Sequence, residues 1–124
     1  MVDMNLGDDP AEVRARWLEL REMDDQIAKG NKDPNEAIPR AIARYRLLTD
    51  RDRPVIDEVL IRQIESPEED TRFVALALVD TCRITSAAEA LHRLKDWLKE
   101  QSFPGAPYEV ARVDGILRTL NEPV

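Results

Sequence analysis

The sequence predicts an all-α fold. No segment alternates apolar and polar residues over six or more positions, whereas apolar residues recur at the 3.6-residue spacing of an amphipathic helix along most of the chain. Recurring helix-start signatures precede several of these segments. At 124 residues and 43% hydrophobic residues, the chain is long enough to bury a core without metal or disulfide help. We therefore expect one α-helical domain over residues 1–124, with residues 1–8 as a disordered tail.

The first predicted helix runs from Pro10 to Lys29. Its face contains Val13, Trp17, Leu20 and Ile27. Gly30 and Asn31 should end it, because either residue readily takes the left-handed conformation. Asp24 and Asp25 oppose the negative end of the helix dipole there, and we interpret them as solvated residues.

Apolar spacing predicts five further helices. The second starts near Pro39, because proline is poorly tolerated inside a helix. The fourth, from residue 72 to 83, is apolar nearly all round and should be central. The residues that define the other helices are Ile38, Ile42, Tyr45 and Leu48; Val55, Val59, Leu60 and Ile64; Leu91, Leu94 and Leu98; and Val110, Val113, Leu117 and Leu120.

A four-residue signature marks four of the predicted helix starts. It stands at residues 9–12, 33–36, 66–69 and 86–89 as DPAE, DPNE, SPEE and SAAE. The first side-chain oxygen can accept a hydrogen bond from an orphan amide, and the glutamate reaches back to the amide of the capping residue. We assign these acids a structural role rather than a chemical one.

Arginine recurs at the start of three apolar stretches, at Arg40, Arg72 and Arg112. The pattern from residue 54 to 120 resembles HEAT-like repeats, and the best-fitting residues are Asp70, Arg72, Ala75, Ala77 and Leu78. The resemblance implies about six helices in antiparallel pairs, stacked as a short right-handed α-superhelix that is typically used for protein binding. The alternative is an irregular six-helix bundle around one core.

The sequence predicts no catalytic residue, metal site or cofactor. Cys82 and His92 are the only cysteine and histidine. We interpret Cys82 as a small buried hydrophobe and His92 as a surface residue. The four glycines stand far apart, so no phosphate loop is indicated. Acids are nevertheless abundant, which leaves a carboxylate- or metal-dependent enzyme as a further alternative.

Charge is distributed unevenly along this chain of net charge −7. Residues 37–53 carry five bases and two acids, between residues 1–36 with ten acids and five bases and residues 54–70 with six acids and one base. The predicted partner-binding cluster on the basic segment contains Arg40, Arg44, Tyr45 and Arg46. The other interpretation is that these arginines pair within the fold, with Glu19, Glu22, Asp57 or Glu58.

These features favour a non-enzymatic protein-interaction module or adaptor that binds another protein. The alternative is an acidic inhibitor or immunity-type protein for a basic toxin or nuclease, because complementary charge accelerates association. Its acidic face would contain Glu65, Glu68, Glu69 and Asp70. We expect no duplex DNA partner at this charge, no membrane span, a cytoplasmic location, and a monomer or weak homodimer.

Overall fold

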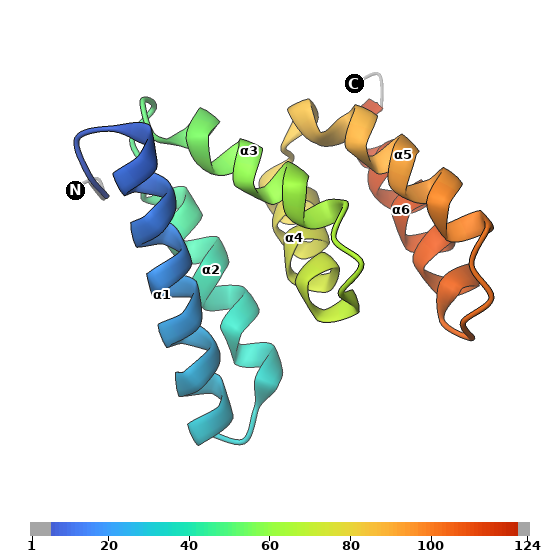
Figure 1. Cartoon of the computed structure of the whole chain (residues 1–124), viewed down its shortest axis with the longest axis horizontal. Coiled ribbons are helices and arrows are strands. Elements are labelled where there is room, and N and C mark those ends of the chain that lie inside the picture. The colour runs from blue at the N-terminus through green and yellow to red at the C-terminus, as the bar shows by residue number, and fades with distance from the viewer. Residues whose placement is uncertain (1–5, 122–124) are drawn as a thin grey trace. The chain divides into compact units, whose positions relative to one another are not determined.

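The computed structural model describes residues 6–121, with the side chain of Pro34 left out, and this part of the chain is all-α. Its six α-helices are α1 (Pro10–Gly30), α2 (Ala37–Arg46), α3 (Arg53–Ile64), α4 (Glu69–Cys82), α5 (Ala88–Lys99) and α6 (Ala106–Asn121) (Figure 1). Two short 3₁₀ helices, η1 (Pro34–Glu36) and η2 (Thr85–Ala87), precede α2 and α5. The predicted fold class is confirmed, and each α-helix covers a segment in which apolar spacing predicts one.

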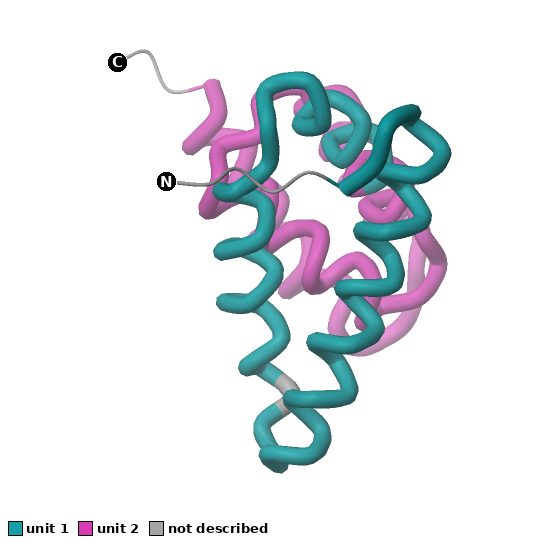
Figure 2. The backbone as a smooth tube through the Cα atoms, turned by 90° about the vertical axis from the view of Figure 1, so that its left-hand side faces the viewer, with its two compact units in different colours: residues 1–59 teal, residues 60–124 magenta. Residues whose placement is uncertain are grey.

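The chain divides into two compact units, residues 1–59 and residues 60–124 (Figure 2). Helix α3 contributes its first part to unit 1 and its last part to unit 2. The single domain stays a prediction. Residues 1–5 of the predicted tail lie outside the described residues, whereas Leu6 is buried and the Asp8 amide donates to the Glu12 carboxylate at 2.9 Å.

Unit 1 contains an antiparallel hairpin of α1 and α2 (Figure 1). The buried apolar residues of the two helices are Val13, Trp17, Leu20, Ala28, Ala37, Ala41 and Tyr45. Helix α1 ends at Gly30, one residue after the predicted end, and the left-handed residue is Lys32 (φ 59°) rather than Gly30 or Asn31. The amides of Lys32 and Asp33 donate to the carbonyls of Lys29 and Ala28, which is the hydrogen-bond pattern of a Schellman motif.

In unit 2, α5 and α6 form a second antiparallel hairpin, and α4 packs against α6 (Figure 1). Five consecutive α4 residues, 75–79, are buried. Successive helical residues point in directions about 100° apart, so these five cover every side of the helix. The other helices contribute mainly one stripe each to the buried residues, with Leu91, Leu94 and Leu98 from α5 and Val113, Ile116 and Leu117 from α6.

Only the first of the four start signatures forms a helix cap. Asp9 accepts from the Glu12 amide at 2.9 Å, as predicted, although the Glu12 carboxylate accepts from the amide of Asp8 rather than that of Asp9. At the second signature, the Asp33 carboxylate accepts from the Asn35 amide at 3.2 Å. This segment forms η1, and α2 begins only after it.

The third and fourth signatures are wrong as predictions of helix caps. The Ser66 hydroxyl does accept a hydrogen bond from the Glu68 amide at 3.1 Å, but α4 begins only at Glu69. The Ser66 and Pro67 carbonyls, which lie outside the helix, accept hydrogen bonds from the Arg72 side chain. Ser86 lies inside η2, and α5 begins at Ala88 without a side-chain cap. In both places the α-helix begins later than the position that the signature marks.

Candidate functional site

The predicted basic cluster is largely paired inside unit 1. The Arg44 guanidinium donates to both Asp24 oxygens at 2.8 and 3.0 Å, and the hydrogen bond to Asp24 raises the pKa of Arg44. Asp24 is 0% exposed, so its interpretation as a solvated residue is wrong. It lies four residues after Leu20 on the buried face of α1, where a charge is tolerated only with a partner.

Two more residues of the cluster also have acidic partners. Arg40 donates to Glu36 at 3.1 Å, and the buried Tyr45 hydroxyl donates to Asp57 at 2.7 Å. Burial raises the pKa of Asp57. Arg46 is exposed and forms no ion pair with any residue between 6 and 121.

The acids that accept these hydrogen bonds are Asp24, Glu36 and Asp57. Of these three, only Asp57 is among the partners predicted from the sequence. The cluster therefore offers a partner protein much less charge than its sequence implies.

The alternative acidic face keeps most of its charge. Glu65 is paired with Arg93, and this hydrogen bond raises the pKa of Arg93. Glu68 accepts from the Thr71 hydroxyl at 3.3 Å. The three acids at positions 68–70 are exposed and form no ion pair within the described part of the chain. Three negative charges are thus accessible at the start of α4.

Arg72, two residues after Asp70, is a buried residue with a structural role. Its side chain is 1% exposed, and it donates to both oxygens of Glu109 at 2.9 and 2.8 Å. It also donates to the Ser66 and Pro67 carbonyls at 3.1 and 2.9 Å. The guanidinium carbon lies 5.2 Å from the ring centre of Trp97. One buried charge therefore fixes the segment before α4, the start of α6 and an aromatic ring.

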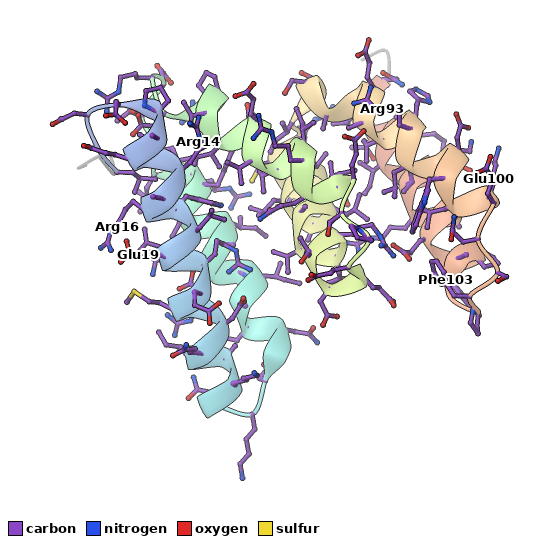
Figure 3. The ribbon with its side chains drawn as sticks, in the orientation of Figure 1. Arg14, Arg16, Glu19, Arg93, Glu100 and Phe103 are labelled. Carbon is purple, nitrogen blue, oxygen red and sulfur yellow. The ribbon has the colours of Figure 1, made fainter. Side chains whose placement is uncertain are left out.

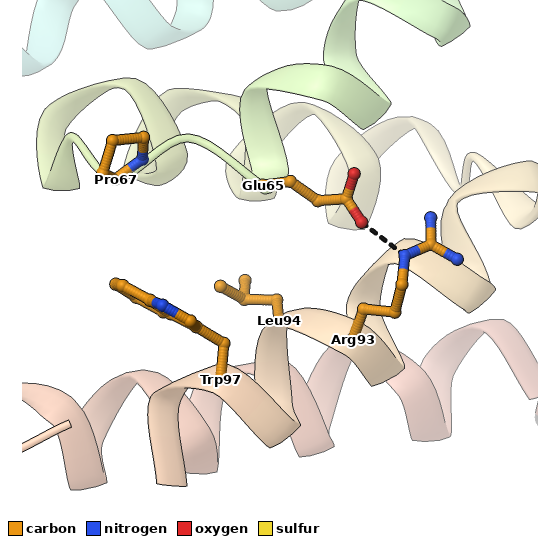
Figure 4. Close-up of a pocket in the computed structure, with 5 residues that line it drawn as sticks. All are labelled: Glu65, Pro67, Arg93, Leu94 and Trp97. Carbon is orange, nitrogen blue, oxygen red and sulfur yellow. Dashed lines mark hydrogen bonds and ion pairs between the residues drawn. The ribbon is translucent and has the colours of Figure 1, made fainter. Parts of the chain in front are cut away.

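A pocket of about 260 Å³ is lined by Pro67 and Trp97, two residues that Arg72 contacts (Figure 4). One wall comes from Glu65 and Pro67, in the connection between α3 and α4. The other comes from three α5 residues, Arg93, Leu94 and Trp97. Sequence reasoning missed this pocket, although Trp97 beside the buried leucine stripe of α5 was an available signal.

Unit 2 exposes its aromatic side chains, whereas unit 1 buries Trp17 and Tyr45. The exposed or half-buried rings are Phe73, Trp97, Phe103 and Tyr108. Phe103 lies in the loop after α5, beyond Glu100 (Figure 3), and its ring centre is 6.4 Å from that of Trp97. Phe73 carries the Arg112 guanidinium 4.5 Å above its ring, and burial lowers the pKa of Arg112. Three of the four rings are thus in contact with an arginine.

Cys82 and His92, the residues considered for catalysis or metal binding, do not line this pocket. Cys82 is half-buried and His92 is exposed. Among residues 6–121, no group of three or more His, Cys, Asp or Glu side chains is arranged to hold a metal ion. No helix in the described ranges is long and apolar enough to cross a membrane.

Comparison with protein-family models, with curated proteins and with solved structures finds no match for this chain. The resemblance to HEAT-like repeats and the right-handed superhelix stay predictions.

Proposed function

We propose that this chain is a non-enzymatic protein-interaction module that binds a basic partner protein. The binding site is a surface of unit 2, here called the aromatic–acidic surface, which consists of Pro67, Trp97, Phe103 and the acids Glu68, Glu69 and Asp70. The observation that carries this proposal is that the accessible rings of Trp97 and Phe103 contact each other, while the Phe103 ring and the Glu69 carboxylate both lie within about 4 Å of a Cβ placed on Gly105 and the acids at positions 68–70 form no ion pair with any residue between 6 and 121.

The aromatic part of this surface is suited to binding. Tryptophan and arginine are enriched among the residues that contribute most to protein–protein affinity. Trp97 and Phe103 both contact Arg72, at 5.2 and 5.9 Å from its guanidinium carbon. Because Arg72 is buried and forms four hydrogen bonds, the two rings are held in position before a partner arrives. Such preorganisation reduces the entropy lost on binding.

The acidic part of the surface selects the charge of the partner. The carboxylates at positions 68–70 attract a basic protein, which accelerates association and disfavours acidic partners. By contrast, Arg40, Arg44 and Tyr45 of the predicted basic cluster are engaged with acids of their own unit. These contacts lead us to place the binding face in unit 2 rather than on α2.

An inhibitor of a basic toxin or nuclease is the second candidate function. The same three exposed acids favour it, because an inhibitor of this kind covers a basic surface of its target. An adaptor and an inhibitor would use the same face. An adaptor leaves the activity of the bound partner intact, whereas an inhibitor lowers it. Assaying an identified partner with and without this chain distinguishes the two.

The test is selection of peptides from a random library on the immobilised full chain. We expect basic peptides whose affinity falls about tenfold or more in the Trp97→Ala variant. A triple variant, Glu68→Gln with Glu69→Gln and Asp70→Asn, should weaken binding most at low salt, where charges are least screened. Circular dichroism checks that each variant is folded.

Two matched controls accompany these variants. Tyr108→Ala removes a more exposed ring outside the aromatic–acidic surface, and Arg46→Glu removes the accessible charge of α2. Neither should change the affinity by more than about twofold. Failure to select any peptide would overturn the proposed function. Peptides that bind the Trp97 and acidic variants as tightly as the wild type would overturn the proposed surface.

A further inference from the structure

We infer that the pocket between Pro67 and Trp97 receives one arginine side chain of the basic partner. This inference rests on the proposed function and adds the chemistry of the group that is bound. The pocket, at about 260 Å³, is smaller than the roughly 300–1,000 Å³ of small-molecule sites. It therefore suits a single side chain presented by a protein better than a whole metabolite.

The pocket walls match the shape and polarity of arginine. Pro67, Leu94 and Trp97 supply apolar surface. The aliphatic part of an arginine side chain packs against such surface, and its planar guanidinium stacks on an indole ring. Arg72 fixes two of these walls together, because it holds the Pro67 carbonyl at 2.9 Å and the Trp97 ring centre at 5.2 Å.

A carboxylate at the side of the pocket can bind the guanidinium. Glu65 accepts from Arg93 through one oxygen, Oε1 (Figure 4). Its second oxygen, Oε2, has no hydrogen-bond partner among residues 6–121. In Figure 4 this oxygen points away from Trp97, so a guanidinium would donate to it at the rim of the pocket, and such charge-assisted hydrogen bonds are the stronger ones.

The two charges that line the pocket balance each other, and exposed acids follow the pocket residue Pro67 in the chain. Arg93 is paired with Glu65, and Arg72 is paired with Glu109, so these two cations are balanced locally. Directly after the pocket residue Pro67 come the three exposed acids at positions 68–70. A cation entering between Pro67 and Trp97 is therefore attracted, and cation–π contact with the indole adds to this attraction.

Other side chains fit this pocket less well. An acidic side chain would meet Glu65 and the acids after Pro67, and the single cation that lines the pocket, Arg93, is already engaged. An apolar side chain would cover the Glu65–Arg93 pair without offering a hydrogen bond, which costs free energy. Lysine supplies the charge but lacks the planar group that stacks on Trp97. Of these side chains, only arginine combines an aliphatic part for the apolar walls, a planar donor for Glu65 Oε2 and a positive charge.

The experiment is an NMR titration of the full chain with the peptide acetyl-Gly-Gly-Arg-Gly-Gly-amide at millimolar concentrations. We expect shifts of the Trp97 indole N–H and of the amides at 65–69 and 93–97, while the buried Trp17 indole serves as an internal reference. The same peptide with citrulline keeps the shape and loses the charge, and it should bind about fivefold more weakly or worse. A lysine peptide should fall between the two.

Two matched variants test whether the Glu65 carboxylate itself binds the arginine peptide or whether any nearby negative charge has the same effect. Glu65→Gln removes the carboxylate that lines the pocket and should lower the affinity for the arginine peptide about fivefold or more. Glu89→Gln removes another acid near Arg93, at 4.0 Å, that does not line the pocket, and it should leave the affinity within about twofold. Both residues are exposed, so neither change threatens the fold.

Three results would overturn the arginine subsite: no shift with the arginine peptide, equal affinity for the citrulline peptide, or equal effects of the two glutamate variants. These outcomes are distinguishable from failure of the proposed function. If library peptides bind through Trp97 yet tolerate citrulline at every arginine, the interaction module stands and the subsite is wrong. If the library yields no peptides, the interaction module itself is wrong.

Discussion

Asp24 is a carboxylate inside α1 that water does not reach, and Arg44 binds both of its oxygens. Removing a carboxylate from water costs several kcal/mol, and only a well-placed partner offsets this cost. For the same reason, removing one partner destabilises a protein by more than the pair contributes. Arg44 is therefore a structural residue, and reversing its charge would test stability rather than partner binding.

We predict that Asp24→Ala lowers the free energy of unfolding by about 3 kcal/mol or more, because it leaves the partly buried Arg44 guanidinium without its carboxylate. The neighbouring Asp25→Ala is the control. Asp25 is half exposed and paired with Arg21 at 3.2 Å, so its loss should cost about 1 kcal/mol or less. Urea denaturation measures both values. Equal losses in the two variants would contradict a special role for Asp24.

The helix starts show that one sequence signature has different structural outcomes. Residues 9–12 and 86–89 share the capping pattern, but only Asp9 accepts the expected hydrogen bond, from the Glu12 amide. Ser86 lies within η2, which directly precedes α5. The amide of Ala87 at the end of η2 donates to the Ile84 carbonyl, a backbone partner that belongs to the 3₁₀ turn. The short turn thus replaces the cap that the signature predicts.

We predict that Asp9→Ala costs about 1 kcal/mol of stability, within the range of about 0.5–2 kcal/mol known for such caps. Ser86→Ala, the matched change at the signature that forms no cap, should alter stability by about 0.5 kcal/mol or less. Thermal and urea unfolding of both variants measure the difference. A loss at Ser86 as large as at Asp9 would mean that α5 is capped by Ser86 in solution.

Each of the two compact units contains its own buried arginine–carboxylate pair. Arg44 and Asp24 join the two helices of unit 1, and Arg72 and Glu109 join α4 to α6 in unit 2. Proteins often open in cooperative parts whose stabilities differ. A pair that stabilises one unit should therefore protect mainly the amides of that unit from exchange with solvent.

We predict that Asp24→Ala accelerates amide hydrogen exchange mainly in α1 and α2, and that Arg72→Met accelerates it mainly in α4 and α6. The reason is that each substitution leaves a buried or partly buried charge unpaired inside one unit. Hydrogen exchange followed by mass spectrometry measures the two patterns. If both variants accelerate exchange uniformly over the chain, the units open together, and the prediction of one domain over residues 1–124 is the better description.

The sequence by itself determined the all-α class and the positions of the six helices. Both depend on local properties, since apolar spacing and breaking residues act within a few positions along the chain. This is why the end of α1, within one residue, and the buried leucine stripe of α5 agree with the structure. The acidic residues after Pro67 were also identified from the sequence, because charge and position along the chain can be read directly.

Only the tertiary structure decided which charges are paired and where a pocket forms. Arg44 is 20 positions from Asp24, and Arg72 is 37 positions from Glu109, so neither partner follows from local spacing. The pocket likewise joins Pro67 to Trp97, which belong to different elements. Contacts between distant residues depend on which helix faces meet, and that choice is made by packing of the whole unit. Packing therefore engages Arg40, Arg44 and Tyr45 of the basic cluster with acids of unit 1, whereas the acids at positions 68–70 stay exposed.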